Sequence, residues 1–220
     1  MRHGPFLAAL LGAALGAACV STSTAGHSDT ETTRPAAVTT PVTVGAAERG
    51  VDVGFLGDSL LFEIGGKMDA RLPGARLVVQ GVPGLTSVLA LPLVAAIREQ
   101  QPVAVAVVIG TNDALRTGGR PKVADLRALA DRLAWVPCIR WVTVTEDTVD
   151  PFLRAGAPVV NEELAALVAG RPGAALVPWH ELVAEHRDWL EEDGVHHSPT
   201  GEEALADQVA AALRTCPGVG

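Results

Sequence analysis

The most apolar strand-length segment of this 220-residue chain reads VAVAVVI, from Val103 to Ile109, and Gly110-Thr111-Asn112-Asp113 follows it directly. An unbroken run of small and β-branched apolar residues is typical of a strand that is buried on both faces of a parallel sheet. Four further runs of strand length are spread along the chain, and they are Val51–Leu56, Ala75–Val79, Ile139–Thr145 and Ala174–Val177.

Longer segments with apolar residues at helical spacing alternate with these runs. They are Leu60–Ala70, Ser87–Gln100, Val123–Ala134, Val159–Ala169 and Glu202–Arg214. Strands that alternate with helices are joined by right-handed crossovers, so the helices cover both faces of a parallel sheet. The sequence therefore predicts a three-layer α/β/α sandwich with a parallel five-stranded sheet, of the flavodoxin-like kind. In such sheets ligands bind where strands end and helices begin.

Composition supports one folded unit and argues against nucleic acid as a partner. The chain is 48% hydrophobic and 19% charged, which is enough apolar material for one sizeable core. Seventeen Lys and Arg residues against 25 Asp and Glu residues give the chain a formal net charge of −8 at pH 7. A net negative chain without a basic cluster is poorly suited to bind phosphate backbones.

The first 48 residues do not resemble the rest of the chain. Arg2 precedes an apolar run, Phe6–Ala18, that ends in small residues before Cys19, which is the pattern of an export signal. Two endings stay open: simple cleavage, or lipidation of Cys19, although Gly16 stands where lipoprotein signals favour Leu. Residues 20–48 are rich in Ser, Thr, Ala and Pro and predict a disordered tether. We therefore expect a signal over residues 1–19, a tether over 20–48 and one domain over 49–217.

Three of the predicted strands run into polar or glycine-containing turns. Ser59 follows the first strand in Gly57-Asp58-Ser59-Leu60, at a helix amino end where a developing anion is favoured. Gly81 follows the second strand within Gln80-Gly81-Val82-Pro83-Gly84, and Asn112 follows the third. Each also has a plainer interpretation, namely a helix cap for Ser59, a turn glycine for Gly81 and a local backbone turn for Asn112.

A second group of polar residues, Asp193-Gly194-Val195-His196-His197, lies just before the last predicted helix. This spacing lets Asp193 hold one nitrogen of the His196 ring while the other nitrogen faces a nucleophile, as in a hydrolytic triad. Zinc is the rival interpretation of paired histidines. Adjacent His196 and His197 point in different directions, and no third well-spaced ligand stands nearby, so the sequence argues against a metal site.

Together these segments resemble the SGNH hydrolase superfamily, also called the GDSL esterases and lipases, over roughly Val51–Arg214. The resemblance implies the SGNH hydrolase fold, a catalytic triad of Ser59, Asp193 and His196, and an oxyanion hole formed by Ser59, Gly81 and Asn112. Gln80 stands where the family often has Asn before the glycine. Residues 161–196 are also similar to SGNH domains found with bacterial cell-surface acyltransferases.

The resemblance implies a serine esterase that cleaves O-acyl esters through an acyl-enzyme, without a metal or organic cofactor. The substrate is then a small-molecule or glycan ester. The alternatives are an O-acyltransferase that acts on cell-surface glycans and a non-catalytic binding lipoprotein. Hydrolysis is favoured because the sequence carries no multi-helix membrane domain that could supply acyl groups. The protein is expected to be exported, either secreted or tethered to the outer face of a bacterial membrane through Cys19, and its oligomeric state is left open.

The positions of the cysteines predict one disulfide. If Cys19 is cleaved off or lipidated, an even pair remains in an exported protein. Cys138 precedes the fourth strand and Cys216 follows the last helix, so both lie at the amino edge of the sheet and predict a disulfide.

The acidic residues after the fourth strand and two tryptophans are candidate substrate contacts, although solvated loops and core packing are commoner roles. These residues are Glu146, Asp147, Asp150, Trp179 and Trp189, and His180 and His186 are expected on a surface helix.

Overall fold

Five parallel strands form the centre of the computed structural model, which describes residues 52–219. The strand order is β2-β1-β3-β4-β5, and every neighbouring pair is parallel. Their bounds are β1 Asp52–Gly57, β2 Arg76–Gly81, β3 Ala104–Val108, β4 Cys138–Val142 and β5 Ala174–Val177. The predicted α/β fold with a parallel five-stranded sheet is confirmed. The signal, the tether and Cys19 lie outside the described residues.

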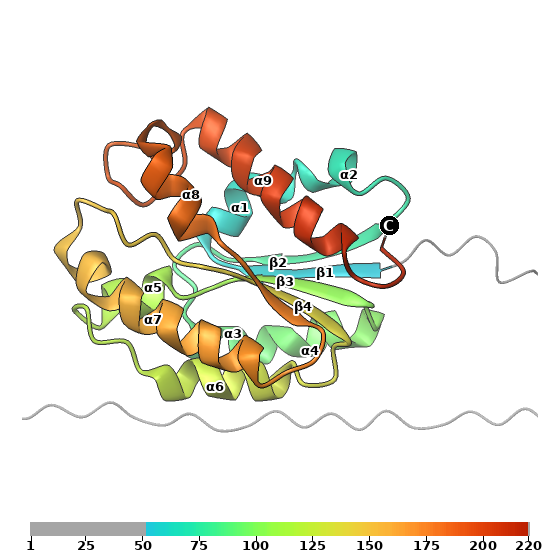
Figure 1. Ribbon diagram of the computed structural model, residues 1–220. Helices are drawn as coiled ribbons and strands as arrows, with labels where there is room; N and C mark the ends of the chain where they lie inside the picture. The colour runs from blue at the N-terminus through green and yellow to red at the C-terminus, as the bar shows by residue number, and fades with distance from the viewer. Residues whose placement is uncertain (1–51, 220) are drawn as a thin grey trace, which may run out of the picture. The chain divides into compact units, whose positions relative to one another are not determined.

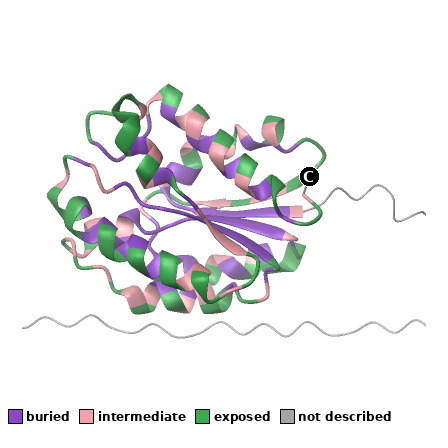
Figure 2. Cartoon of the chain, in the orientation of Figure 1, coloured by how far each residue is buried: buried purple, intermediate pink, exposed green. Residues whose placement is uncertain are grey.

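The alternation of side chains along the central strand divides the core into two halves. Ala104, Ala106 and Val108 of β3 belong to one apolar cluster, whereas Val105 and Val107 belong to the other. This is the period of two that a strand imposes on its side chains. Figure 2 shows the resulting buried sheet between two layers whose outer surfaces are exposed.

The helices cover the two faces of this sheet (Figure 1). One face carries α1 Ser59–Gly65, α2 Met68–Arg71, α8 Trp179–Glu185 and α9 Pro199–Arg214, with the 3-10 turn η2 Arg187–Trp189 beside them. The other face carries α3 Ser87–Ala90, the 3-10 turn η1 Leu91–Leu93, α4 Val94–Gln100, α5 Thr111–Arg116, α6 Val123–Arg132 and α7 Pro151–Ala169. Within residues 52–219, no helix is long and apolar enough to cross a membrane.

Three predicted helices differ from the structure for reasons that lie in Gly and Pro. Leu60–Ala70 is divided into α1 and α2 around Gly65 and Gly66, which weaken a helix interior. Ser87–Gln100 is divided at Pro92, which falls in the 3-10 turn η1. The helix predicted to begin at Val159 begins instead at Pro151. There the Asp150 side chain accepts hydrogen bonds from the first turn, and Pro158 is accommodated inside the helix.

The last helix, α9, is attached to the domain by a disulfide, by surface ion pairs and by its buried apolar face. At the amino end of the sheet, Cys216 after α9 forms a disulfide with Cys138, the first residue of β4, with the two Cα atoms 5.8 Å apart. Along its exposed side, α9 pairs with Lys67 and Arg71 through Glu202, Glu203 and Asp207. Surface ion pairs contribute little individually, so the buried apolar face of α9 provides most of its attachment. This attachment places the loop before α9 above the carboxyl end of β1.

Candidate active site

Ser59 is the first residue of α1, separated from the end of β1 only by Asp58, and its hydroxyl is not used to cap that helix. The cap is Asp58, whose Oδ1 accepts a 3.0 Å hydrogen bond from the N–H of Leu60. The hydroxyl of Ser59 instead lies 3.1 Å from Nε2 of His196, which is 137 positions away in the chain. The interpretation of Ser59 as a helix cap is therefore wrong, because Asp58 occupies that role.

His196 and Asp193 lie in the loop between η2 and α9. Nδ1 of His196 is 2.7 Å from Oδ2 of Asp193, while Oδ1 of Asp193 accepts main-chain hydrogen bonds from Val195 and His196. The loop is further closed by a hydrogen bond from the N–H of Glu191 to the carbonyl of His196. The imidazole is thus fixed between a carboxylate on one side and the hydroxyl of Ser59 on the other, which is the arrangement of a nucleophile, a base and an orienting acid.

Charges around His196 favour its protonated form. The hydrogen bond to Asp193 raises the pKa of His196 above its ordinary value, against an opposing effect of partial burial. The negative charges of Asp193, Glu63 and Asp58 act in the same direction as that hydrogen bond. Burial by itself would raise the pKa of Asp193, but the hydrogen bonds from the His196 ring and the main chain lower it. Asp193 is therefore an anion wherever His196 works as a base.

Asn112 reaches the same site from α5. Its side-chain Nδ2 donates a 2.9 Å hydrogen bond to Oδ2 of Asp58, so the amide does not close a turn on its own backbone. The next residue, Asp113, is buried and accepts a 3.0 Å hydrogen bond from the N–H of Ser87, which ties α5 to the start of α3. An Asn amide carries two N–H groups, and the hydrogen bond to Asp58 uses one of them.

Asp58 was not among the predicted site residues, yet it contacts two parts of the site. Its side chain is fully buried, and burial raises its pKa to about 7, although hydrogen bonds from Leu60 and Asn112 act to lower it. A buried carboxyl group that contacts both the helix of Ser59 and the amide of Asn112 couples these two parts of the site. The motif Gly57-Asp58-Ser59-Leu60 contains this residue, but the sequence alone gives no sign of its burial.

Gly81 is the last residue of β2, where it pairs with Gly57 of β1. It also lines a surface cavity of about 350 Å³ between α1 and β2, with Phe62, Gly65, Gly66 and Val79. The turn that follows contains Gly84, whose φ of +75° favours glycine and whose open side faces the flexible guanidinium end of Arg116. The oxyanion role of Gly81 stays a prediction.

The second histidine of the pair, His197, points away from His196. Its Nδ1 lies 2.7 Å from Oε2 of Glu63, a residue of α1 that the sequence analysis did not single out. The two rings therefore have separate partners on the same helix, and they do not converge on one point. Among the residues that the structure describes, no group of three His, Cys, Asp or Glu side chains is arranged to hold a metal ion.

The other candidates of the sequence analysis have partners within the fold. Glu146 accepts a hydrogen bond from Asn161, and Asp147 pairs with Arg187. Trp179 is buried in the core and stacks on Trp189, with ring centroids 5.5 Å apart. His186 was expected on the same helix as His180 but follows the end of α8, where its ring stacks on Trp189 with centroids 4.1 Å apart. His180 lies in α8 as expected, 3.1 Å from Glu181.

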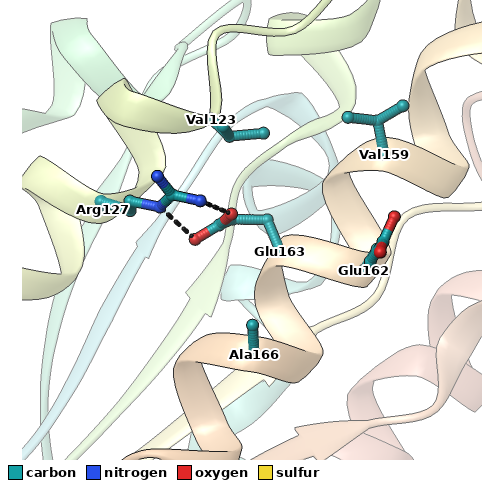
Figure 3. A pocket seen from close by; sticks show the side chains of 6 residues that line it. All are labelled: Val123, Arg127, Val159, Glu162, Glu163 and Ala166. Atoms are coloured by element: carbon teal, nitrogen blue, oxygen red, sulfur yellow. Dashed lines mark hydrogen bonds and ion pairs between the residues drawn. The ribbon is translucent and has the colours of Figure 1, made fainter.

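A further surface cavity lies between α6 and α7, with a volume of about 360 Å³. Figure 3 shows Arg127 of α6 directed at Glu163 of α7, to which it donates two hydrogen bonds of 2.7 and 2.8 Å. This ion pair satisfies both charged groups within the protein. The cavity belongs to the opposite helical layer from Ser59 and is not part of the candidate site.

Comparison with known proteins identifies the family and the fold of the chain. Residues 55–204 match the GDSL-like Lipase/Acylhydrolase family. No curated protein matches the chain. The fold is similar to that of a lipolytic G-D-S-L family protein from Veillonella parvula (TM-score 0.65, 16% identity, 74% of this chain and 98% of that one). It is also similar to the catalytic domain of peptidoglycan O-acetyltransferase A from Streptococcus pneumoniae (TM-score 0.58, 21% identity, 76% of this chain and 94% of that one). A third similar structure is the esterase EstA of a Pseudoalteromonas species (TM-score 0.57, 18% identity, 74% of this chain and 97% of that one). Because the family match covers most of the described residues, the chain belongs to the GDSL-like lipase/acylhydrolase family.

Proposed function

We propose that the protein is a serine esterase that hydrolyses O-acyl esters through an acyl-enzyme intermediate. The observation that carries this proposal is the continuous series of contacts from Ser59 Oγ to His196 Nε2, at 3.1 Å, and from His196 Nδ1 to Asp193 Oδ2, at 2.7 Å. Membership of a lipase/acylhydrolase family supports the same chemistry.

In the proposed reaction His196 removes the proton of Ser59 as Oγ attacks the ester carbonyl. Asp193 holds the ring in the required tautomer and stabilises the imidazolium, which then protonates the leaving alcohol. The N–H groups of Ser59 and Gly81 and the second N–H of the Asn112 amide receive the oxyanion, each such donor contributing about 100-fold to 1,000-fold in turnover. Water then attacks the acyl-enzyme, with His196 again as the base, and the acid is released. This mechanism requires neither a metal ion nor an organic cofactor.

The principal alternative is transfer of the acyl group to a sugar hydroxyl, because the fold is shared with a domain described as a peptidoglycan O-acetyltransferase. Hydrolysis and transfer use the same Ser59, His196 and Asp193, and they differ only in whether water or a bound hydroxyl meets the acyl-enzyme. A non-catalytic binding lipoprotein is the third alternative, and it predicts that no ester is turned over at all.

A panel of p-nitrophenyl esters of increasing acyl length and acetylated glycans tests the proposal, with Ser59→Ala as the matched inactive variant. Incubation with an activated acetyl ester and chito-oligosaccharides then separates the alternatives when free acetate and acetylated sugar are measured by mass spectrometry. Dominant acetate supports the esterase, dominant acetylated sugar supports the transferase, and no Ser59-dependent product from any ester supports the binding protein.

We also propose that residues 1–19 direct export, and that the domain is either secreted or tethered to the outer face of a bacterial membrane through a lipidated Cys19. The apolar run Phe6–Ala18 that ends at Cys19 supports this. The mass of the mature protein from a bacterial host, compared with that of Cys19→Ala, tests it. A diacylglycerol-sized mass that disappears in the variant supports lipidation, cleavage without added mass supports secretion, and an unprocessed amino terminus contradicts export.

A further inference from the structure

Two adjacent histidines connect the loop before α9 to one helix. His196 reaches Ser59 and His197 reaches Glu63, and these two partners are four positions apart on α1. Residues at this spacing lie one above the other on the same side of a helix. The loop is therefore attached to α1 at two points one helical turn apart, of which only the first belongs to the proposed triad.

The second attachment is buried and uses two hydrogen bonds. Oε2 of Glu63 accepts from Nδ1 of His197 at 2.7 Å and from the main-chain N–H of the same residue at 3.3 Å. The His197 side chain is fully inaccessible, whereas that of His196 is 43% exposed. Glu63 thus fixes both the ring and the backbone of the residue that follows His196.

The surroundings of His197 make its bond to Glu63 important. Its edge meets the ring of Trp179 at a centroid distance of 5.2 Å and an angle of 74°. Its Nε2 is buried without a hydrogen-bond partner among residues 52–219. If the bond to Glu63 were lost, both ring nitrogens would be buried and unsatisfied, which is costly enough to move the loop.

We infer that Glu63 is a positioning residue that holds His196 in line with Ser59 by binding the buried His197. This inference rests on the proposed esterase function. Displacing a base by about 1 Å costs up to a hundredfold in rate, so a second attachment next to His196 acts directly on turnover. The carboxylate of Glu63 also stabilises the imidazolium form of His196, as do Asp193 in the same loop and Asp58 at the start of α1.

The test compares Glu63→Ala with Glu63→Gln and uses Glu162→Gln, an exposed acid on α7, as the matched control. We expect Glu63→Ala to lower kcat between tenfold and a hundredfold with little change in KM, because the substrate site is intact but the base is misplaced. Glu63→Gln keeps an oxygen that accepts from Nδ1 of His197, so most of kcat should return at pH 8. Its acid limb should move to lower pH, because the carboxylate that favours the His196 imidazolium is gone.

A second readout does not depend on turnover. Titration of the His196 ring by NMR should give a lower pKa in Glu63→Gln than in the wild type and in Glu162→Gln. If no ester is hydrolysed in a Ser59-dependent way but this pKa still falls, the proposed function fails and the attachment stands. If Glu63→Ala keeps kcat within twofold of the wild type, or if Glu63→Gln leaves both the acid limb and the NMR pKa unchanged, the positioning role is overturned.

Discussion

The buried carboxylate of Asp58 accepts a hydrogen bond from the side-chain amide of Asn112, with 2.9 Å between Oδ2 and Nδ2. The same carboxylate caps α1, the helix that starts with Ser59. The candidate nucleophile and a candidate oxyanion donor are therefore held in place by one group. Any change of Asp58 should disturb both.

Replacement of Ser59, the candidate nucleophile, gives the most direct prediction. Ser59→Ala should abolish ester hydrolysis and leave the circular dichroism spectrum and the Tm unchanged, because its hydroxyl does not cap α1. His196→Ala should behave in the same way. The control is Thr200→Ala, which removes an exposed hydroxyl near the loop and should be fully active. Hydrolysis in either active-site variant above a small fraction of the wild-type rate would refute the triad.

Asp58→Asn should reduce kcat about tenfold to a hundredfold without a comparable change in KM. The new amide can still cap α1 through its oxygen, but it presents N–H groups to Asn112, so two donors oppose each other. Asn112→Ala provides the comparison, because it removes the other partner of this bond. If both single variants and the double variant lose the same amount of activity, Asp58 acts through Asn112. Independent, additive losses would contradict the coupling.

Asp58 also makes the stability of the fold depend on pH. Its pKa is about 7 in the folded protein and 3.8 for the free side chain, so the folded state binds a proton between these values and the unfolded state does not. The stability that this proton provides is present at pH 4 and is lost as the pH rises through 7. We expect denaturant unfolding of Asp58→Asn to show a smaller loss of stability over this range than the wild type shows. If the free energy of unfolding changes with pH by the same amount in Asp58→Asn and the wild type, Asp58 is not the titrating group.

The rate should fall on acidification, since His196 works as a base only when it is neutral. Because Asp193 raises the pKa of His196, the acid limb of kcat/KM should lie above the ordinary value of 6.5. Asp193→Asn should move that limb to lower pH and also lower the plateau, since the ring loses its orienting acceptor. A kcat/KM that does not change between about pH 5 and 8 would contradict the role of His196.

The disulfide between Cys138 and Cys216 should stabilise the domain by about 2 to 4 kcal/mol, because it closes a long loop in the unfolded chain. Cys138→Ala with Cys216→Ala should therefore lower the Tm substantially. At a temperature well below the new Tm, kcat should be unchanged, because the disulfide lies at the amino end of the sheet and Ser59 at the carboxyl end. Two free thiols in the oxidised, folded wild type would show that the bond does not form.

The sequence was sufficient for the sheet because each strand is a local apolar run, and buried parallel strands need little else to be recognised. Ser59 and Asn112 were predictable as neighbours because residues at the carboxyl ends of parallel strands share one edge. Asp193 and His196 follow no strand, and they were predicted from their spacing in the loop before the last helix and from the family resemblance. Helix bounds were less accurate. The helix α7 begins at the Asp150 cap and continues through Pro158, although an interior proline usually ends a helix. Packing around the helix decides this, and packing cannot be read from the local sequence.

The contacts that support the site were not predictable in the same way. Glu63 and His197 are 134 positions apart, and each looks ordinary in its own segment: an acid on an amphipathic helix and a histidine beside another. Only the docking of the loop on α1 makes them partners. Arg116 is similar, since nothing local shows that its guanidinium faces Gly84.

The separation of Ser59 and His196 by 137 positions has a consequence for how activity appears in time. Ser59, the candidate nucleophile, belongs to the first strand-helix unit of the domain, but His196, its candidate base, comes into place only when α9, the last helix, packs on α1 and α2. A chain that has collapsed without docking this helix has a sheet and a serine but no base beside it. Release of a coloured product from an ester therefore reports the completion of folding, and it should lag behind the recovery of secondary structure during refolding.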